Sequence, residues 1–338
     1  MDEFAMGFTL GYASQTELYH CRILLEHAVL AEKAGFETLW VSDHFHPWSH
    51  SEAQAGHTWV IIGAAAARTS KIKFGTAVTC PLFRYNPAIT AQAFATLRAM
   101  FPGRIFIGLG AGEAMNEIPV GYDWPSPKER IERLDEAIQI MKLLWSRSFV
   151  TFNGKYYRLR RANLYTKPET PVPLYVAAFG PKVAKLAGKY ADGLLTSLVD
   201  PDRLNKVLLP AVAEGAKETG RDPSGIEKVV ELGVAYDEDY DKAVKKVRFW
   251  AGTLFPFMFK LPIYDPREIE NMGKLVSDEA LAKAFFICTK AEDIIKPIER
   301  AVKMGFDHAY LQSTSPDENR FFEIAEKHVV PYIKSTYG

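Results

Sequence analysis

Three short segments of the sequence combine residue types that can carry proton-transfer chemistry. One is Ser42-Asp43-His44, which places a carboxylate directly beside an imidazole, and histidine is the side chain that exchanges protons near neutral pH without help. A second is the run from Gly108 to Glu113, in which an acid follows glycines that let a ring or a backbone approach closely. The third, Phe179-Gly180-Pro181, begins a helix and leaves N–H groups free for a phosphate. Together they predict proton exchange beside a bound anionic cofactor.

Each segment also has a purely structural interpretation. His44 would then cap a loop or bond a backbone carbonyl, the glycines would mark a strained strand corner beside an incidental Glu113, and Pro181 would begin an ordinary helix. The glycine spacing differs from the G-x-G-x-x-G fingerprint and no helix follows it directly, which excludes a Rossmann dinucleotide turn.

A metal centre is the rival interpretation, because His44, His46, His50 and His57 lie close together in the sequence. Metallohydrolases built on barrels use a His-x-His pair but complete the site with histidines from later strands. Here no histidine occurs between His57 and His308. We therefore expect no metal, and the acid, base and glycine loop also argue against a pure binding module.

The composition argues against several classes of partner and compartment. The 338 residues carry 41 basic and 41 acidic side chains, so no net charge attracts nucleic acid or an anionic membrane. Cys21, Cys80 and Cys288 form no CxxC pair, which favours a reducing compartment. The N-terminal Met-Asp-Glu-Phe carries acid where a signal peptide carries base, and no apolar run approaches the ~18 residues of a membrane span. We expect a cytoplasmic protein with no membrane contact.

The elements that must position these segments alternate along the chain. Short apolar runs, each followed by a helical pattern, predict strands at Phe8–Gly11, Glu37–Ser42, Ile72–Val78, Ile105–Gly108, Leu174–Ala177, Gly193–Thr196, Val229–Ala235 and His308–Gln312. Helices are predicted over Leu18–Ala34, Trp59–Arg68, Asn86–Met100 and Ser126–Trp145, and from near Pro181, Pro201, Asp239 and Asp317. Eight such units predict an α/β fold, a (β/α)₈ TIM barrel, whose active site lies at the C-terminal ends of the strands. All three segments fall at such ends.

Two insertions interrupt the alternation. Asn153-Gly154 between aromatic, β-rich arms predicts a hairpin in an insertion at about 146–172. A second insertion at about 256–307 carries a helix with a capping box from Thr289 to Glu292. No linker composition or internal repeat appears, so we expect a single domain over residues 1–338.

Longer stretches carry a family resemblance. These are SDHFHPW at 42–48, FRYNPAITAQAFATLRAMFPGRIFIGLGAGEAMNE at 83–117 and FGPKVAKLAGKYADG at 179–193. They resemble the coenzyme F420-dependent branch of the bacterial-luciferase-like flavin and deazaflavin barrels, and the similarity extends from Gly11 to the last helix. The resemblance implies a luciferase-like barrel, a homodimer, bound F420 and a non-proline cis peptide at Ala77-Val78.

The resemblance also implies roles for individual residues. His44 would be the catalytic acid or base, Glu113 would handle the cofactor's proton, Trp48 would wall the reacting carbinol, and Glu17 matches a family acid near the pocket. Which of His44 and Glu113 is the base stays open. The residues implied to bind the cofactor are Asp43, Ala77, Val78, Cys80, Ala111, Gly112, Asn116, Ala178, Phe179, Gly180 and Lys182.

The substrate follows from where this sequence departs from two groups within the branch. Ser197 and Lys260 match residues of the sugar-phosphate dehydrogenases, but Asp200 and Ala284 stand where those enzymes carry a lysine and an arginine. An acid in place of a base repels a phosphate. The aromatic insertion FWAGTLFPFMFKLPIYDP at 249–266 is similar instead to the alcohol dehydrogenases of methanogenic archaea. Gly233 replaces a tryptophan of that group, which predicts a pocket larger than propan-2-ol requires.

We therefore expect an F420-dependent oxidoreductase that transfers a hydride from a secondary alcohol carbinol to C5 of the deazaflavin, giving a ketone and reduced F420. The alternative within the branch is a glucose-6-phosphate or other sugar-phosphate dehydrogenase. The alternative from another class is an FMN-dependent luciferase-like monooxygenase.

Overall fold

The computed structural model describes residues 7–51, 53–197 and 200–338, so the acidic N-terminal tetrapeptide lies outside the described residues. Its main sheet is parallel throughout, with neighbours in the order β3-β2-β1-β11-β9-β8-β7-β4. The strands are β1 (Thr9–Ser14), β2 (Thr38–Val41), β3 (Lys73–Thr76), β4 (Ile107–Leu109), β7 (Leu174–Ala177), β8 (Gly193–Ser197), β9 (Glu227–Tyr236) and β11 (His308–Ser313).

The sheet closes on itself between β3 and β4. Isolated bridges pair Phe74 with Ile105 and Thr79 with Leu109, and the Thr79 N–H donates to the Gly108 carbonyl at 2.9 Å. The predicted TIM barrel is therefore confirmed. β1 continues to Ser14, where the sequence predicted an end at Gly11, because residues up to Ser14 still pair with β2.

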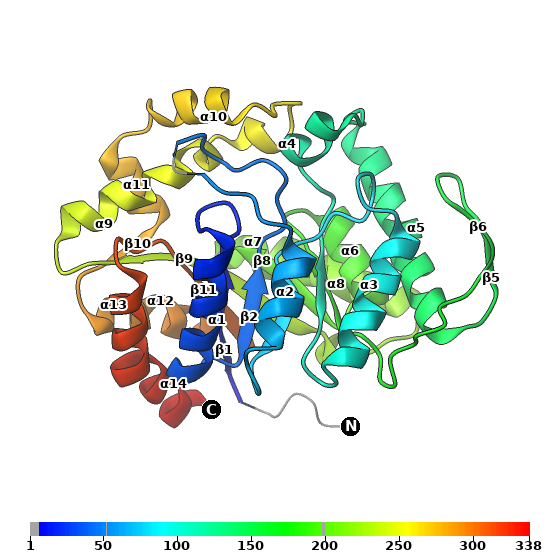
Figure 1. Ribbon diagram of the computed structural model, residues 1–338, viewed down its shortest axis with the longest axis horizontal. Helices are drawn as coiled ribbons and strands as arrows, with labels where there is room; N and C mark the ends of the chain where they lie inside the picture. The colour runs from blue at the N-terminus through cyan, green and yellow to red at the C-terminus, as the bar shows by residue number, and fades with distance from the viewer. Residues whose placement is uncertain (1–6, 52, 198–199) are drawn as a thin grey trace.

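Helices surround the barrel, as Figure 1 shows. No helix in the described part of the chain is long and apolar enough to cross a membrane. The predicted caps at Asn86 and Ser126 are confirmed, since each side chain accepts a backbone N–H of the first turn. The helices are α1 (Cys21–Ala34), α2 (Thr58–Ala66), α3 (Pro87–Met100), α4 (Ala114–Glu117), α5 (Pro127–Ser146), α6 (Pro181–Tyr190), α7 (Pro201–Arg203), α8 (Leu209–Glu218), α9 (Tyr240–Val247), α10 (Pro266–Gly273), α11 (Asp278–Ala284), α12 (Ala291–Lys303), α13 (Glu318–Ile324) and α14 (Val330–Tyr337).

The first insertion forms the predicted hairpin. β5 (Val150–Asn153) pairs antiparallel with β6 (Arg158–Ala162), and residues 154–157 make the turn, closed by a bond from the Gly154 N–H to the Tyr157 carbonyl at 2.9 Å. The hairpin projects from the side of the barrel beside α5 (Figure 1). The Tyr157 hydroxyl in its turn donates to the Leu82 carbonyl, in the loop that follows β3, at 2.8 Å.

The second insertion is divided differently from the expectation. It contains α10, α11 and an unpredicted strand, β10 (Phe286–Cys288), which pairs with the C-terminal residues of β9. That pairing is available because β9 continues past its register with β8, which ends at Ser197 opposite Glu231.

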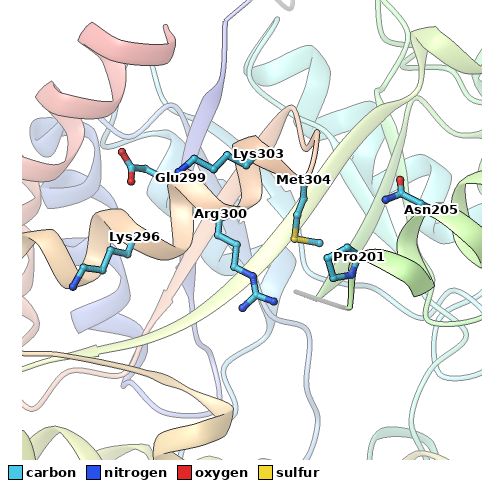
Figure 2. A pocket seen from close by; sticks show the side chains of 7 residues that line it. All are labelled: Pro201, Asn205, Lys296, Glu299, Arg300, Lys303 and Met304. Atoms are coloured by element: carbon cyan, nitrogen blue, oxygen red, sulfur yellow. The ribbon is translucent and has the colours of Figure 1, made fainter.

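The helix α12, expected inside this insertion, packs on the barrel through Ile294, Ile298 and Ala301. The capping box predicted from Thr289 is wrong by one residue. Lys290 occupies the N-cap without a side-chain bond, and Asp293 instead accepts the Thr289 N–H. A groove of about 570 Å³ separates α12 from the segment that begins at α7 (Figure 2), and it is lined by Pro201, Asn205, Lys296, Glu299, Arg300, Lys303 and Met304.

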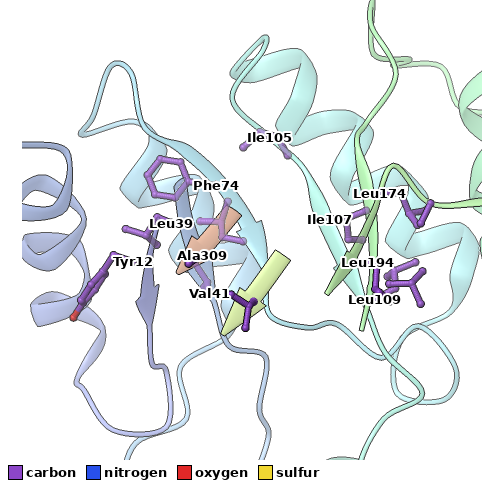
Figure 3. Packing of buried hydrophobic residues seen from close by; sticks show 14 of the residues in the cluster. Tyr12, Leu39, Val41, Phe74, Ile105, Ile107, Leu109, Leu174, Leu194 and Ala309 are labelled. Carbon is purple, nitrogen blue, oxygen red and sulfur yellow. The ribbon is translucent and has the colours of Figure 1, made fainter. Parts of the chain in front are cut away.

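The core has two layers that fix the strand ends. Inside the barrel, the stacked rings of Trp40 and Tyr310 have centroids 5.0 Å apart, and Phe106 and Tyr175 pack against Trp40. Outside the barrel, aliphatic residues join the strands to the surrounding helices, and Figure 3 shows strand residues of this layer such as Leu39, Ile107, Leu174 and Leu194. Because both faces of each strand are buried, the loops at the C-terminal ends start from fixed positions.

Candidate active site

A carboxylate–imidazole cluster forms at the C-terminal ends of the strands. His44, which follows β2, lies with Nε2 3.8 Å from Glu17 Oε1 and 3.6 Å from Glu113 Oε2. Glu17 follows β1 and Glu113 follows β4, so three separate strand ends supply the cluster. The structure thus brings together three of the four residues that the sequence analysis placed at the catalytic centre. The fourth is Trp48, whose ring centroid lies 5.8 Å from that of His44.

The imidazole of His44 is oriented from its other nitrogen. Nδ1 lies 3.1 Å from the His46 carbonyl oxygen, which can only accept a hydrogen bond, and 3.4 Å from Asn116 Nδ2, which can only donate one; the shorter contact assigns the proton to Nδ1. Nε2 is then the nitrogen that faces Glu17 and Glu113. The arrangement leaves Nε2 to exchange a proton with a ligand, with two carboxylates close enough to stabilise its charged form.

Asn116 fixes the loop that carries His44. Its Oδ1 accepts the Phe45 N–H at 2.8 Å, and its Nδ2 donates to Glu113 Oε2 at 3.2 Å. The side chain is 4% exposed and lies in the short helix α4, which follows Glu113 directly. Asn116 therefore couples the base-bearing loop after β2 to the acid-bearing loop after β4. Its predicted role at the cofactor stays a prediction.

The two carboxylates have different surroundings. Glu17 is buried and accepts hydrogen bonds from the hydroxyls of Ser42 and Thr16. Glu113 is 27% exposed at the side chain and accepts from Asn116. Burial raises the pKa of Glu113, His44 opposes that shift and Glu17 adds to it. Glu113 is consequently the acid of the pair that has the larger solvent contact and a raised pKa.

Asp43 is held within a buried network that the sequence analysis missed. Arg84 donates to Asp43 Oδ1 at 2.9 Å and to Glu117 Oε1 at 2.9 Å, while Thr79 donates to Asp43 Oδ2 at 2.5 Å. The Tyr85 hydroxyl adds a bond of 3.2 Å to Asp43. The segment at 83–117 that carries the family resemblance includes Arg84 and Tyr85, but no spacing rule links them to Asp43. Contact of Asp43 with a cofactor stays a prediction.

The sequence analysis also missed Glu231, a further carboxylate near Glu17 and Glu113. It lies on the inward face of β9 and accepts the Tyr310 hydroxyl at 2.6 Å. Burial raises its pKa, and Glu17 and Glu113 raise it further. Glu231 is therefore part of the same electrostatic environment as the cluster.

The residues around the end of β3 form a place where a flat ring fits. The Ala77-Val78 peptide bond is cis, as the family resemblance implied. Ala77 and Val78, together with Ala177, lie partly exposed on top of the inner core. A Cβ at Gly110 would come within 2.6 Å of Val78 Cγ2, so glycine is needed for this close approach.

The glycine after this position has the same constraint. Gly112 has a φ of +80°, and a Cβ there would lie 2.5 Å from Cys80 Sγ. Cys80 is buried in the outer core layer, so its side chain faces Gly112 rather than the open site. Ala111, beside it, is half-buried.

The N-terminus of α6 is open to a ligand. Gly180 is its N-cap and makes no side-chain cap bond, and a Cβ built there would meet no atom within 4 Å. Phe179 is 58% exposed and Lys182 is exposed, whereas the Ala178 side chain is buried in the core. Free N–H groups at the start of this ten-residue helix suit a phosphate. The chemistry of these two regions fits a flat ring system joined to an anionic tail.

The opposite border of the cluster is aromatic and apolar. One buried cluster contains Trp48, Met115, Trp250, Met258 and Ile269, contributed by the loop after β2, by α4 and by the segment that follows α9. The Phe259 ring lies 5.5 Å from that of Trp48. This apolar cluster covers the side of the site next to His44.

The four positions compared with the phosphate clamp of the sugar-phosphate dehydrogenases lie at or near the surface. Lys260 and Ala284 are exposed, and Ser197 is half-buried at the end of β8. The Asp200 carboxylate caps α7 by accepting the Asp202 N–H at 3.2 Å. The larger pocket expected at Gly233 is absent, because the Phe285 ring lies against this glycine. A Cβ built on Gly233 would be only 2.8 Å from Phe285 Cδ1.

The groove beside α12 and the distribution of possible metal ligands were compared with this site. The groove beside α12 in Figure 2 is lined by none of the candidate site residues. Within the described ranges, no three His, Cys, Asp or Glu side chains are grouped so that they could hold a metal ion.

Known proteins resemble this chain over nearly its full length. The profile of the luciferase-like monooxygenase family matches residues 6–308. F420-dependent glucose-6-phosphate dehydrogenases from Segniliparus rotundus and Mycolicibacterium smegmatis are 39% and 40% identical to it, covering 98% and 96% of this chain and 99% and 98% of theirs. The solved structure of an F420-dependent secondary alcohol dehydrogenase in complex with an F420–acetone adduct is 46% identical, with a TM-score of 0.93, covering 97% of this chain and 99% of that chain. The names of these relatives divide between a sugar phosphate and an alcohol as substrate.

Proposed function

The chain belongs to the luciferase-like monooxygenase family, and from that premise we propose that it is an F420-dependent oxidoreductase that converts a secondary alcohol to a ketone. The observation that carries the proposal is His44 Nε2, which faces two carboxylates next to an apolar, aromatic wall. Bound F420 supplies the hydride acceptor at C5, so the chain itself has to supply binding and proton transfer.

His44 is the group that takes the proton of the alcohol hydroxyl. Its Nδ1–H is occupied by the His46 carbonyl, so the free lone pair is on Nε2. Proton uptake creates an imidazolium, and Glu17 at 3.8 Å stabilises that positive charge. Ser42 and Thr16 hold Glu17 in place through their hydroxyls.

Glu113 is the group that holds the proton exchanged with the cofactor. Burial raises the pKa of this carboxyl, which favours the protonated form that can donate. The two neighbouring groups thus have environments suited to opposite tasks, a base at His44 and an acid at Glu113.

The lining supports a neutral donor over a phosphorylated one. Trp48, Met258 and Phe259 present apolar surface beside His44. A phosphate dianion needs fixed cationic or N–H donors, whereas Ala284 offers no charge and Asp200 offers a negative one. A small apolar alcohol loses little hydration on entering such a pocket.

A sugar phosphate is the second candidate, and it also has support. The two curated relatives described above bear the name of glucose-6-phosphate dehydrogenases at 39% and 40% identity. Ser197 and Lys260 are present as a partial set of phosphate donors. The substrate is therefore decided by assay.

Purified protein supplied with F420 is expected to bleach the coenzyme's visible absorption when propan-2-ol is added, and to remain coloured with glucose 6-phosphate. The control is the same mixture without alcohol. Bleaching by glucose 6-phosphate and by no alcohol would transfer the assignment to the sugar phosphate. A protein that is purified yellow with FMN and consumes oxygen would instead belong to the monooxygenase class.

We also propose that the protein works as a homodimer. Apolar side chains are exposed on three consecutive helices, with Ile23 of α1 42%, Val60 of α2 69% and Ile89 of α3 55% exposed. Exposed apolar groups on the surface of a protein favour a protein interface. Analytical ultracentrifugation is expected to give twice the chain mass for the wild type and a monomer for Val60→Glu. A wild-type monomer at micromolar concentration would contradict the proposal.

The cytoplasm is the compartment we propose. Cys21, Cys80 and Cys288 are free thiols in the structure, which suits a reducing environment.

A further inference from the structure

On the inward face of β9, the position at the level of the candidate site is a glycine. Val229 packs in the inner core and Glu231 accepts the Tyr310 hydroxyl, so both point into the barrel. Side chains alternate along a strand, and Gly233 is therefore the next inward position towards the C-terminal end. Its partner across the sheet is Gln312 of β11. The barrel wall has no side chain of its own at Gly233.

Phe285 fills the space that Gly233 leaves. β10 pairs with β9 in parallel register, with Phe286 opposite Val234 and Ile287 opposite Ala235. Residues paired across a sheet share a face, which places Phe285 on the same inward side as Gly233. A Cβ at Gly233 would lie 2.8 Å from Phe285 Cδ1 and 3.2 Å from Cε1. The ring lies directly against the glycine.

Phe285 also belongs to the apolar wall beside the catalytic imidazole. It packs against the cluster that contains Trp48 and Met258, and against a second cluster that contains Leu281. The Trp48 ring centroid is 5.8 Å from that of His44. Packed apolar side chains therefore connect the neighbourhood of His44 with Phe285.

We propose that Phe285 is the specificity-determining residue that limits the size of the alcohol's alkyl arm, in the place that a side chain at residue 233 would otherwise occupy. The inference rests on the proposed function. Small secondary alcohols fit between the imidazole and this ring, and alcohols with long or aromatic arms meet the ring itself. Since the ring comes from the insertion and not from β9, donor size is set by a segment outside the eight barrel strands.

The test compares kcat/KM for propan-2-ol, butan-2-ol and 1-phenylethanol in wild type and Phe285→Ala. Phe285→Ala is expected to raise the ratio of kcat/KM for 1-phenylethanol to that for propan-2-ol at least tenfold, since a change of one methylene alone alters such ratios by roughly 10- to 200-fold. Phe286→Ala is the matched control, because Phe286 is the adjacent ring, is equally half-buried and packs on the outer core. Its ratio should equal that of the wild type.

Two further variants keep the test decisive. Phe285→Leu removes less volume and should shift the ratio in the same direction if Phe285→Ala folds poorly. The double variant Gly233→Leu with Phe285→Ala returns volume from the other strand and should restore the preference for propan-2-ol. An unchanged ratio in Phe285→Ala and Phe285→Leu, with normal F420 binding by fluorescence, would overturn the inference alone. A wild type that binds F420 but oxidises no alcohol would overturn the proposed function and the donor pocket with it.

Discussion

At the scale of single residues, the proposed chemistry depends on one imidazole with its two nitrogens in different environments. His44 Nδ1 is engaged by a backbone carbonyl, and Nε2 is directed at two carboxylates. A side chain that only capped a loop would not need acids on its free nitrogen. The geometry therefore favours the catalytic interpretation of His44 over the structural one.

Replacing this imidazole is expected to remove the chemistry and preserve binding. His44→Asn should lower kcat for propan-2-ol by about 10²- to 10⁴-fold, the usual contribution of a general base. The dissociation constant for F420, measured by fluorescence titration, should stay within about twofold because the flanking loop keeps its bonds to Asn116. His50→Asn, an exposed histidine of the same loop, serves as the control and should match the wild type. Equal activity in His44→Asn and wild type would exclude the imidazole as the base.

The sequence revealed the residues that chemistry makes unusual but not those that position them. Asp43-His44 and the glycine run beside Glu113 are recognisable because their types are adjacent in the chain. Arg84 and Glu231 act through contacts that only the closed barrel creates, with Asp43 and with the acidic cluster respectively. A lone arginine or glutamate in a sequence carries no mark of such a partner.

At the scale of elements, the loop that carries Glu17 is tied to the last barrel strand through a buried acid. Glu318, at the start of α13, accepts hydrogen bonds from Tyr12 of β1, from Tyr19 in the same loop as Glu17 and from Ser313 of β11. Burial is the largest cause that raises the pKa of Glu318, to about 7. This contact makes the position of the loop depend on a group that titrates near neutral pH.

The stability of the protein should fall with pH because of Glu318. Between pH 4.5 and about 7 the unfolded chain ionises at this residue while the folded chain keeps its proton, so the free energy of unfolding decreases as pH rises and levels off above pH 7. At about 1.4 kcal/mol for each pH unit, the loss amounts to about 3 kcal/mol. Glu318→Gln should lack this loss.

Urea denaturation at pH 5 and pH 8 measures the effect. The difference between wild type and Glu318→Gln should change by about 3 kcal/mol across that interval, whereas the exposed acid Glu323, replaced by Gln, should leave the wild-type pH dependence intact. Parallel pH curves for wild type and Glu318→Gln would show that Glu318 ionises normally in the folded protein.

The alternation of strands and helices was predictable, and the inserted segment was not. Periodicity identifies the eight barrel strands because each of them is buried on both faces. β10 is three residues long, and it forms only because the C-terminal end of β9 extends beyond its pairing with β8. The cap of α12 shifted to Lys290 because Asp293 bonds back to Thr289 in place of the predicted pair.

At the scale of the whole molecule, barrel closure is what makes a site from distant parts of the chain. Glu17, His44 and Glu113 come from three strand ends, and the wall beside them combines Trp48 and Met115 with residues that follow β9. The closed sheet holds these ends at fixed spacing, so the site needs no folding of its own. The barrel follows from the sequence pattern alone, whereas the identity of the deazaflavin depends on the family.

The proposed function requires that the hydride passes directly from a secondary alcohol carbon to F420 bound in this site. The most direct measurement uses propan-2-ol deuterated at carbon 2, with mass spectrometry or NMR of the reduced coenzyme. One deuterium at C5 of F420 is expected, together with a slower reaction than with ordinary propan-2-ol. No deuterium at C5, or reduction of F420 by glucose 6-phosphate but by no alcohol, would contradict it.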